Sequence, residues 1–284
     1  GRTCAAPEPC DNLNTNHDDY INLLRKIRSL KGVKKVFVRS GLRYDYVLAD
    51  NNKAFVKELC QYHVSGQLKV APEHISKRVT TMMGKAGKEE FLTFKQWFEE
   101  ANRQLGKKQY LVPYFMSSHP GCTLDDAIEL AEFLRDQGMY PEQVQDFIPT
   151  PGSLSTCMYY TGINPLDGKP VFVEKKGRGK AMQRALMQYR NNDNYDLVKE
   201  ALIKANRRDL IGFGPQCLIP PRPIGRHKGD NKGQANRKPM RGQGRHTSPK
   251  GMGRSKEDGT LYGSPKKGNK PIHGRRTFVG KARP

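Results

Sequence analysis

Acidic residues are scarce in this sequence: 28 Asp and Glu stand against 50 Lys and Arg in 284 residues, a formal net charge of +22. The excess is unevenly distributed. Residues 1–150 carry 21 basic and 19 acidic side chains, whereas residues 151–284 carry 29 and 9. This asymmetry excludes a uniform globule, and we expect one ordinary domain followed by a basic appendage.

Long apolar runs are also absent. No stretch approaches the ~20 apolar residues that a membrane helix needs, and the first residues lack the charged and apolar regions of a signal peptide. The composition therefore predicts a soluble, cytoplasmic protein. The sequence begins with Gly1 rather than Met, which leads us to expect a fragment of a longer chain.

Cysteine is sparse, with six residues spread over the whole chain. This density argues against a disulfide scaffold, so reduced thiols are expected. Cys4 and Cys10 form a C-x5-C pair, which lies outside the C-x2–4-C spacing of common zinc sites. They are either two plain thiols or part of a metal site completed upstream.

Between residues 18 and 150, helical periodicity alternates with short apolar runs, the pattern of βα units around a parallel sheet. The expected helices are 18–30, 53–62, a helix through Phe91, Phe94, Phe98, Ala101 and Leu105, and one that begins at Thr123 with a capping box to Asp126. The expected strands are 34–38, 67–71, 109–116 and 144–148. Four such units fit half of an α/β barrel or an open doubly wound sheet. Nothing before Asp18 offers a partner for the first strand, so strands are expected to be missing upstream.

After residue 150 the pattern changes to a loop over 152–168 and two helices at about 180–189 and 195–206, which we interpret as a small helical annex without an independent core. Residues 221–284 hold 18 basic and 3 acidic side chains, with 12 Gly and 7 Pro. Such a segment buries too little apolar surface to offset its chain entropy and is predicted to be disordered. Its charge blocks favour non-specific binding to the phosphates of RNA or a ribosome.

Polar residues follow each expected strand, at positions 39–45, 72–74, 117–121 and 149–152. Ligands of α/β folds bind beyond the carboxyl ends of parallel strands, so these residues are the candidate site. No phosphate-binding loop or G-x-S-x-G elbow is present. His74 and His119 lie there too, but neither has a second His or Cys at metal-ligand spacing.

The strand-end sequences together resemble one family. The segments TNHDDYINLLRKIRSLKGVKKVFVRSGLRYDY, LKVAPEH, QYLVPYFMSSHPG and QVQDFIPTPGSLSTCMYYTG lie between Thr15 and Ile163. They closely resemble the YgiQ family of radical S-adenosylmethionine proteins. The resemblance implies an α/β fold in which residues 18–160 are the C-terminal four βα units of a partial (β/α)6 barrel. Residues 1–17 would then be an irregular edge, 161–220 a mostly helical C-terminal domain, and 221–284 a basic extension.

The resemblance also implies a [4Fe-4S] cluster that splits S-adenosylmethionine, held by a C-x3-C-x2-C motif. No such spacing exists among the six cysteines, so this chain alone is expected to be inactive, with its cluster ligands upstream of Gly1. No metal ligand or catalytic residue is assigned within it.

The cofactor-binding residues that the resemblance suggests are Glu73, Ser117, Ser118, Ile148, Pro149, Arg39 and Arg43. Glu73 would face the ribose or methionine end of the cofactor, the two serines its polar groups, and the backbone at Ile148 and Pro149 its adenine. An arginine of the RSGLRYD turn would meet a carboxylate. The structural alternatives are that Glu73 caps the next helix and that Arg43 pairs with Asp45.

Two hypotheses follow. The first is a radical S-adenosylmethionine enzyme of unknown substrate, of which this chain is the C-terminal portion. The second is a non-catalytic nucleic-acid-binding or ribosome-binding module that acts through its basic tail.

Overall fold

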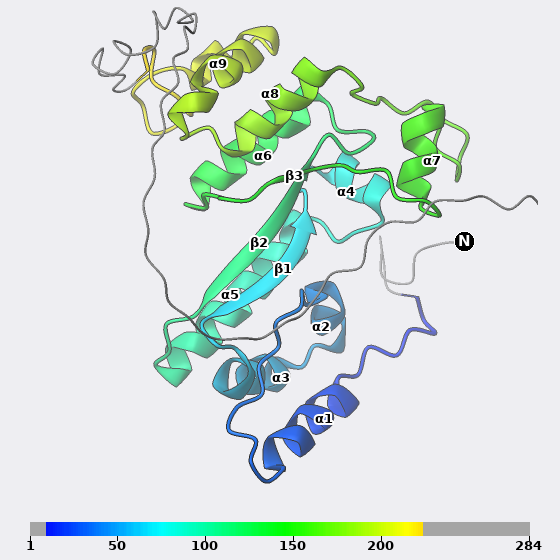
Figure 1. The fold of residues 1–284 in the computed structure, drawn as a ribbon, viewed down its shortest axis with the longest axis vertical. Helices are drawn as coiled ribbons and strands as arrows, with labels where there is room; N and C mark the ends of the chain where they lie inside the picture. Colours follow the sequence, from blue (N-terminus) through cyan, green and yellow to red (C-terminus); the bar gives the residue numbers. More distant parts are fainter. Residues whose placement is uncertain (1–9, 224–284) are drawn as a thin grey trace, which may run out of the picture. The chain divides into compact units, whose positions relative to one another are not determined.

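The chain folds as a mixed α/β structure around a small parallel sheet. The computed structural model describes residues 10–223, all within one compact unit (Figure 1). The sheet has the order β1-β2-β3, with β1 at Gln67–Glu73, β2 at Tyr110–Ser117 and β3 at Gln145–Asp146. Both strand pairings are parallel, so the carboxyl ends of the strands lie along one edge of the sheet.

Nine α-helices are found within residues 10–223. In chain order they are α1 (Asp18–Ser29), α2 (Tyr44–Asp50), α3 (Lys53–Glu58), α4 (Lys77–Met83), α5 (Lys88–Leu105), α6 (Leu124–Asp136), α7 (Leu154–Thr161), α8 (Gly177–Met187) and α9 (Tyr195–Lys204). Three short helical turns complete the fold: a π-helical turn η1 (Leu59–His63) and two 3-10 turns, η2 (Asn192–Asn194) and η3 (Arg208–Leu210). The longer helices coincide with the segments that periodicity predicts.

The clearest predictions are confirmed in α5 and α6. The apolar stripe of α5 is buried at Phe91, Phe94 and Phe98. At the start of α6 the Thr123 side chain accepts from the backbone N–H of Asp126, whose carboxylate accepts in return from the Thr123 N–H at 2.7 Å. This reciprocal pair is the predicted capping box.

Three short helices were not predicted. α2 and α4 have seven residues each and α7 has eight, too few turns to show a convincing apolar periodicity. In place of the predicted loop at 152–168, α7 forms because the Ser153 side chain accepts from the Thr156 N–H and caps its first turn.

The predicted strand at 34–38 is wrong. That segment is irregular and is tied down by a hydrogen bond from the Val38 N–H to the His63 carbonyl at 2.9 Å. Val36 and Val38 pack against the helical core instead, while Phe37 stays 40% exposed. Only Leu42 reaches the sheet, through a single parallel bridge to Val70.

The fourth predicted strand, 144–148, shortens to the two residues of β3. Its flanking residues Val144 and Phe147 are buried, as an apolar run predicts. The described residues thus form an open sheet of three strands. They do not complete a barrel, and the partial barrel stays a prediction.

Two clusters of buried apolar side chains hold the described residues together. The sheet core joins β1 and β2 to α1, α2, α3, α5 and one side of α6. The annex core joins the opposite side of α6 to α8, α9 and η3. The annex helices thus bury their apolar side chains together with α6, and not in a core that is independent of the rest of the chain.

One face of the sheet is not covered by the helices of residues 10–223. Leu68 and Val70 are fully buried beneath α5, whereas Gln67, Lys69 and Tyr110 are exposed on the opposite face, which lies in front of α5 in Figure 1. A groove of about 740 Å³ runs over this face. Among residues 10–223, no helix has the length and apolar character to cross a membrane. The predictions for residues 224–284 lie outside the described residues.

Candidate functional site at the carboxyl ends of the strands

Glu73, Ser117 and Asp146 are the last residues of the three parallel strands. Glu73 pairs with Phe115 and Ser117 pairs with Asp146, so the three side chains belong to one edge of the sheet. The strands point toward the end where α4, α7 and α8 lie (Figure 1). The structure thus brings two of the predicted cofactor-binding residues, Glu73 and Ser117, to the same edge.

The backbone at this edge has an unusual conformation. Glu73 has φ of 63° and Ser118, directly after β2, has φ of 59°. The two other described non-glycine residues with positive φ are asparagines, Asn51 and Asn206, which tolerate this region better. Left-handed Glu and Ser cost about 1–3 kcal/mol each and cluster at functional sites in proteins. Two of them end adjacent strands here.

The Glu73 carboxylate pairs with Lys85. The Lys85 ammonium lies 2.9 Å from Oε1 of Glu73 and also donates to the carbonyl of Ala71 at 3.2 Å. The next helix, α4, has Ser76 as its N-cap, so Glu73 does not cap it. Glu73 is 21% exposed, which leaves part of the carboxylate open to a ligand.

The two serines that end β2 face different partners. Ser117 donates to a carboxylate oxygen of Asp146 at 2.5 Å and so ties β2 to β3. The Ser118 N–H donates to the side-chain oxygen of Gln183 at 3.0 Å. The Ser118 hydroxyl is buried and has no hydrogen-bond partner among the described residues, an arrangement that costs free energy unless a ligand or water satisfies it.

Gln183, from α8, joins the annex to this edge. Its side-chain oxygen accepts from Ser118, and its amide nitrogen donates to the carbonyl of Cys122 at 3.1 Å. The side chain is 2% exposed. One amide therefore satisfies a backbone donor and a backbone acceptor on both sides of the turn after β2.

His74 and Cys122 form a buried polar pair at the same edge. Nδ1 of His74 accepts from the Ser76 N–H at 3.0 Å, which assigns the ring proton to Nε2, 3.6 Å from the Cys122 sulfur. Burial lowers the pKa of His74 to about 4 and raises the pKa of the Cys122 thiol to about 12. Both groups are neutral at pH 7, so the thiol is a poor nucleophile.

His119 links the turn after β2 to α7. Its Nδ1 lies 2.7 Å from the Pro120 carbonyl and its Nε2 lies 2.8 Å from the Ser155 hydroxyl. The carbonyl accepts only, so Nδ1 carries the proton and Ser155 donates to Nε2. Burial lowers the pKa of His119 to about 4.

Asp126 is the common hydrogen-bond partner of several polar groups beneath this edge. It accepts from Ser76 Oγ at 2.8 Å and from the hydroxyl and N–H of Thr123, and it pairs with Arg78. Burial alone would raise the pKa of Asp126, but the hydrogen bonds from Arg78, Thr123 and Ser76 outweigh burial and hold it below the usual range.

The remaining predicted cofactor-binding residues either lie away from the strand ends or are at least partly exposed to solvent. Ile148 is 74% exposed and Pro149 is half-buried. Arg39 is exposed and forms no ion pair with a described residue. Arg43 donates to both carboxylate oxygens of Asp45, at 2.9 and 2.6 Å, so the predicted alternative is confirmed.

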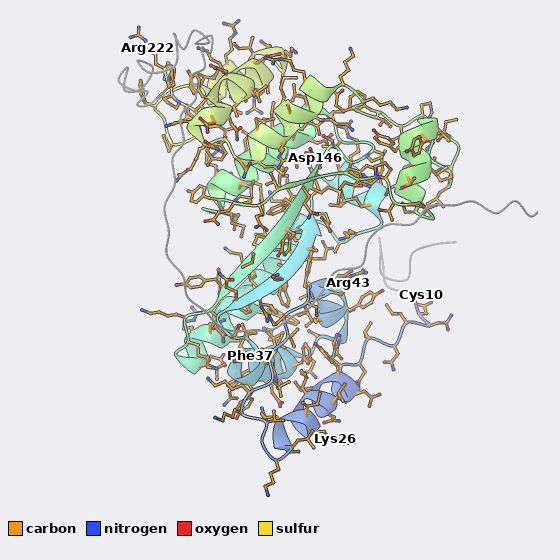
Figure 2. The ribbon with its side chains drawn as sticks, viewed as in Figure 1. Cys10, Lys26, Phe37, Arg43, Asp146 and Arg222 are labelled. Carbon is orange, nitrogen blue, oxygen red and sulfur yellow. The ribbon has the colours of Figure 1, made fainter. Side chains whose placement is uncertain are left out.

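The turn that carries the two arginines follows no strand. Leu42 pairs with Val70 in the middle of β1, which places the turn alongside β1 rather than beyond its carboxyl end. Figure 2 shows Arg43 beside α2, well away from Asp146 at the end of the sheet.

The chemistry available at this edge suits ligand binding better than nucleophilic catalysis. The histidines and the thiol are neutral, and the described residues contain no group of three or more His, Cys, Asp or Glu arranged to hold a metal ion. Lys85, Gln183 and Ser155 belong to the site but were not predicted. None of them directly follows a strand, and that position was the only sequence signal by which site residues were predicted.

Comparison with known proteins gives one family model and a set of close relatives. The model, described as a domain of unknown function (DUF3362), matches residues 142–275. A UPF0313 protein of Clostridium botulinum (strain Okra / Type B1) is 58% identical over 219 residues, which are 77% of this chain and 34% of the relative. A UPF0313 protein of Methanocella arvoryzae is 56% identical over 220 residues, 78% of this chain and 36% of the relative. The chain thus spans about a third of the length of these relatives.

Proposed function

Because the chain belongs to the UPF0313 family, the YgiQ family that its motifs resemble, we propose that it is the C-terminal portion of a radical S-adenosylmethionine enzyme. In this proposal the three strands and their helices are part of a partial (β/α)6 barrel, and the exposed sheet face is its interior. The carboxyl ends of the strands bind the cofactor.

The observation that carries the proposal is the pair of left-handed residues, Glu73 and Ser118, at the ends of adjacent parallel strands. Barrel and open-sheet enzymes place their ligands at this edge. The strain is retained where the surrounding structure fixes it, here through Lys85 and Gln183. The unpaired Ser118 hydroxyl adds a buried polar group that a ligand would satisfy.

The described residues do not fit the iron–sulfur cluster. Of the six cysteines, none occur as C-x3-C-x2-C. Those that the structure describes are Cys10, Cys60, Cys122, Cys157 and Cys217. Cys60 and Cys122 are buried, which raises the pKa of each to about 12, the opposite of what a thiolate ligand needs. The proposal therefore takes the cluster ligands from the part of the relatives that this chain does not match.

The strand ends fit the polar part of S-adenosylmethionine better. The partly exposed carboxylate of Glu73 is placed to accept hydrogen bonds from a ribose hydroxyl or an ammonium group. Ile148, 74% exposed beside Pro149, offers an apolar surface to adenine. S-adenosylmethionine supplies the 5′-deoxyadenosyl group in this class of enzyme; the residues of this chain bind and orient it.

The test uses the complete protein that contains this chain, purified without oxygen and reconstituted with iron and sulfide. With dithionite added as the electron donor, we expect reductive cleavage of S-adenosylmethionine to methionine and 5′-deoxyadenosine, whose new hydrogen atom comes from the buffer or a substrate. Glu73→Gln should weaken cofactor binding by about tenfold or more, since a hydrogen bond to a charged group contributes about 1.5–3 kcal/mol.

The matched control is Glu58→Gln, which removes another carboxylate that is paired with a basic residue, Arg25, on the surface of α3. This variant should bind the cofactor as the unmodified protein does. If the reconstituted protein neither binds nor cleaves S-adenosylmethionine, the proposal fails.

The alternative function is nucleic-acid or ribosome binding through residues 221–284, with no chemistry at the strand ends. It is favoured by the 18 basic and 3 acidic side chains of that segment. Removing residues 224–284 retains Pro221, whose carbonyl accepts from the Tyr195 hydroxyl at 2.7 Å. Loss of RNA binding with cofactor cleavage intact would assign the segment a docking role. Absence of cleavage in the complete protein would favour the alternative.

A further inference from the structure

Exposed aromatic rings and lysines lie together around α7 and the segment that leads into α8. We refer to Tyr159, Tyr160, Phe172, Lys175, Lys176 and Lys180 as the α7 surface. Tyr160 is 68% exposed and Phe172 is 50% exposed. Neither side chain contributes to a core, so the strand-end site described above does not account for them.

Four residues of the α7 surface, Tyr159, Tyr160, Lys175 and Lys180, are held close to one another. The rings of Tyr159 and Tyr160 lie edge to face, 5.3 Å apart. The Lys180 ammonium donates to the Tyr159 hydroxyl at 3.1 Å and lies 5.0 Å from the centre of that ring, and the Lys175 ammonium lies 5.9 Å from it. The Val171 N–H donates to the Gly162 carbonyl at 2.7 Å, which holds the segment carrying Phe172 against the end of α7.

Positive charge is concentrated in the same segment. Residues 169–190 contain seven basic side chains and one acidic side chain. Lys169, Arg178 and Arg184 are engaged with Asp167, Glu200 and Asp146. Lys175, Lys176 and Lys180 form no ion pair with a carboxylate of residues 10–223, so their charges remain available to an anionic partner.

The α7 surface adjoins the strand ends. Ser155 of α7 hydrogen-bonds His119, the His119 ring lies 5.1 Å from the Phe147 ring, and the Phe147 ring lies 5.7 Å from that of Tyr159. A polymer lying on the α7 surface would therefore pass beside the mouth of the candidate site.

We propose that the α7 surface binds single-stranded nucleic acid, with bases stacked on Tyr160 and Phe172 and phosphates neutralised by Lys175, Lys176 and Lys180. Aromatic rings beside basic groups are the combination that single strands require, because their bases expose flat faces that a duplex hides. An acidic peptide would use the lysines but would leave the two rings without a role. The inference is independent of the proposed radical chemistry, since binding needs no cofactor.

The first experiment measures binding of a fluorescein-labelled oligouridine of about 12 nucleotides, within the site sizes of such proteins, to the complete 284-residue chain by fluorescence anisotropy. We expect Tyr160→Ala/Phe172→Ala to weaken binding by about tenfold or more, in line with the effect of removing stacking rings. The control, Phe37→Ala/Phe213→Ala, removes two other exposed rings, 40% and 89% exposed, and should bind as the unmodified chain does. Melting temperatures of all variants should agree, because the four rings are exposed.

The dependence of oligouridine affinity on salt concentration tests the contribution of the lysine charges. Lys175→Gln/Lys176→Gln should lower the magnitude of the slope of log K against log[salt] by about 1.4, at about 0.7 per phosphate contact of a single strand. Lys31→Gln/Lys34→Gln, which removes two exposed lysines near α1, should leave the slope unchanged. The proposal is overturned if the aromatic variant binds oligouridine as tightly as the unmodified chain. It is also overturned if only the lysine variant loses affinity, equally for oligouridine and polyglutamate.

A second measurement does not depend on variants. Photocrosslinking an oligonucleotide that carries 4-thiouridine, followed by mass spectrometry, should identify the peptides that contain Tyr160 or Phe172. Crosslinks confined to peptides after Arg222 would assign all binding to the C-terminal segment and overturn the proposal for the α7 surface.

Discussion

The two hydrophobic cores differ in the size of the side chains that fill them. Of the 22 buried residues of the sheet core, seven are aromatic, namely Tyr44, Phe55, Phe91, Phe94, Phe98, Phe115 and Phe133. The 14 buried residues of the annex core include four alanines, Ala127, Ala131, Ala185 and Ala201, and two aromatic residues, Tyr189 and Tyr195. Large rings fill the space between a sheet and its helices, whereas small residues let α6, α8 and α9 pack closely.

α6 shows the difference within one helix. Phe133 and Leu134 face the sheet core, while Ala127 and Ala131 face the annex core. A helix buried on both sides cannot lose one partner without exposing apolar surface. The sheet and the annex are therefore distinct in packing, but because they share α6 we expect them to unfold as one cooperative unit. The strand-end site lies where they meet.

Among single substitutions, the largest expected loss of stability comes from the sheet core. Phe94→Ala removes a fully buried ring of α5 and should reduce the free energy of unfolding by about 3–5 kcal/mol. Urea titration followed by circular dichroism should show a single, earlier transition that includes the annex helices. A second transition at the original urea concentration would separate the two regions and contradict their cooperation. Phe213→Ala, at an 89% exposed ring, should change the free energy by less than about 0.5 kcal/mol.

The next prediction concerns the pH dependence of stability, which we expect to arise from two histidines at the junction of the two regions. The pKa values of His74 and His119 are lowered to about 4 in the folded state, against about 6.5 when unfolded. Between these values the unfolded chain binds protons that the folded chain does not, so stability falls as the pH drops from about 6.5 toward 4. The loss should be on the order of 3 kcal/mol for each histidine, at about 1.36 kcal/mol per pKa unit.

His74→Asn/His119→Asn is the variant that checks this assignment. Asparagine retains an acceptor for the Ser76 N–H and a donor for the Pro120 carbonyl, but it does not titrate. Urea titrations between pH 7 and pH 4 should therefore show a flatter pH dependence for the variant. An unchanged pH dependence would mean that other groups are responsible.

Gln183→Leu breaks the direct link between the annex and the strand ends. The substitution leaves the Ser118 N–H and the Cys122 carbonyl without their partner, at a cost of about 1–3 kcal/mol for each buried group. Gln188→Leu, at the C-cap of α8 with its amide bonded to the Glu142 carbonyl at an exposed site, is the control and should cost much less. Equal losses in the two variants would show that Gln183 is no more important than a surface glutamine.

Ala201→Leu sharpens the contrast in side-chain size. Ala201 is completely buried in the annex core, and adding a larger side chain to a close-packed helix contact costs about 1–3 kcal/mol. The melting temperature should fall accordingly. A neutral result would show that the annex core contains free space and is not packed as closely as its alanines indicate.

The smallest effect is expected at Arg43, outside both cores. Its side chain is 52% exposed, while that of its partner Asp45 is 10% exposed. Ion pairs of exposed arginines contribute about 0–1 kcal/mol. Arg43→Ala should shift the urea midpoint only slightly. In the complete protein it should also leave binding of S-adenosylmethionine unchanged, since Arg43 lies away from the strand ends. A strong loss of cofactor binding would show that Arg43 contributes to the candidate site.

The sequence revealed those parts of the fold whose signals are local. The stripe of Phe91, Phe94 and Phe98 and the capping box at Thr123 each lie within a few turns of one helix, and both are confirmed. The strand predicted at 34–38 failed because its apolar residues are also satisfied by packing on helices. Periodicity does not distinguish these two environments in a run of five residues.

The site residues also differ in whether a local sequence signal predicts them. Glu73 and Ser117 were found because each ends an apolar run. Gln183 was not, because it reaches Ser118 across 65 positions in the sequence and no local pattern encodes that contact. The left-handed conformations of Glu73 and Ser118 were equally hidden, since such positions usually favour glycine or asparagine.

The position of Gln183 and Lys180 on a single helix has a thermodynamic consequence. Gln183, whose amide holds the turn after β2, lies three positions after Lys180, whose ammonium lies beside Tyr159. If a ligand at the strand ends shifts α8, it changes the affinity of the α7 surface for its partner. Linkage then requires that partner to change the affinity for the ligand by the same factor. Binding of either occupant would then change the affinity for the other, and the shift of α8 would couple the two sites.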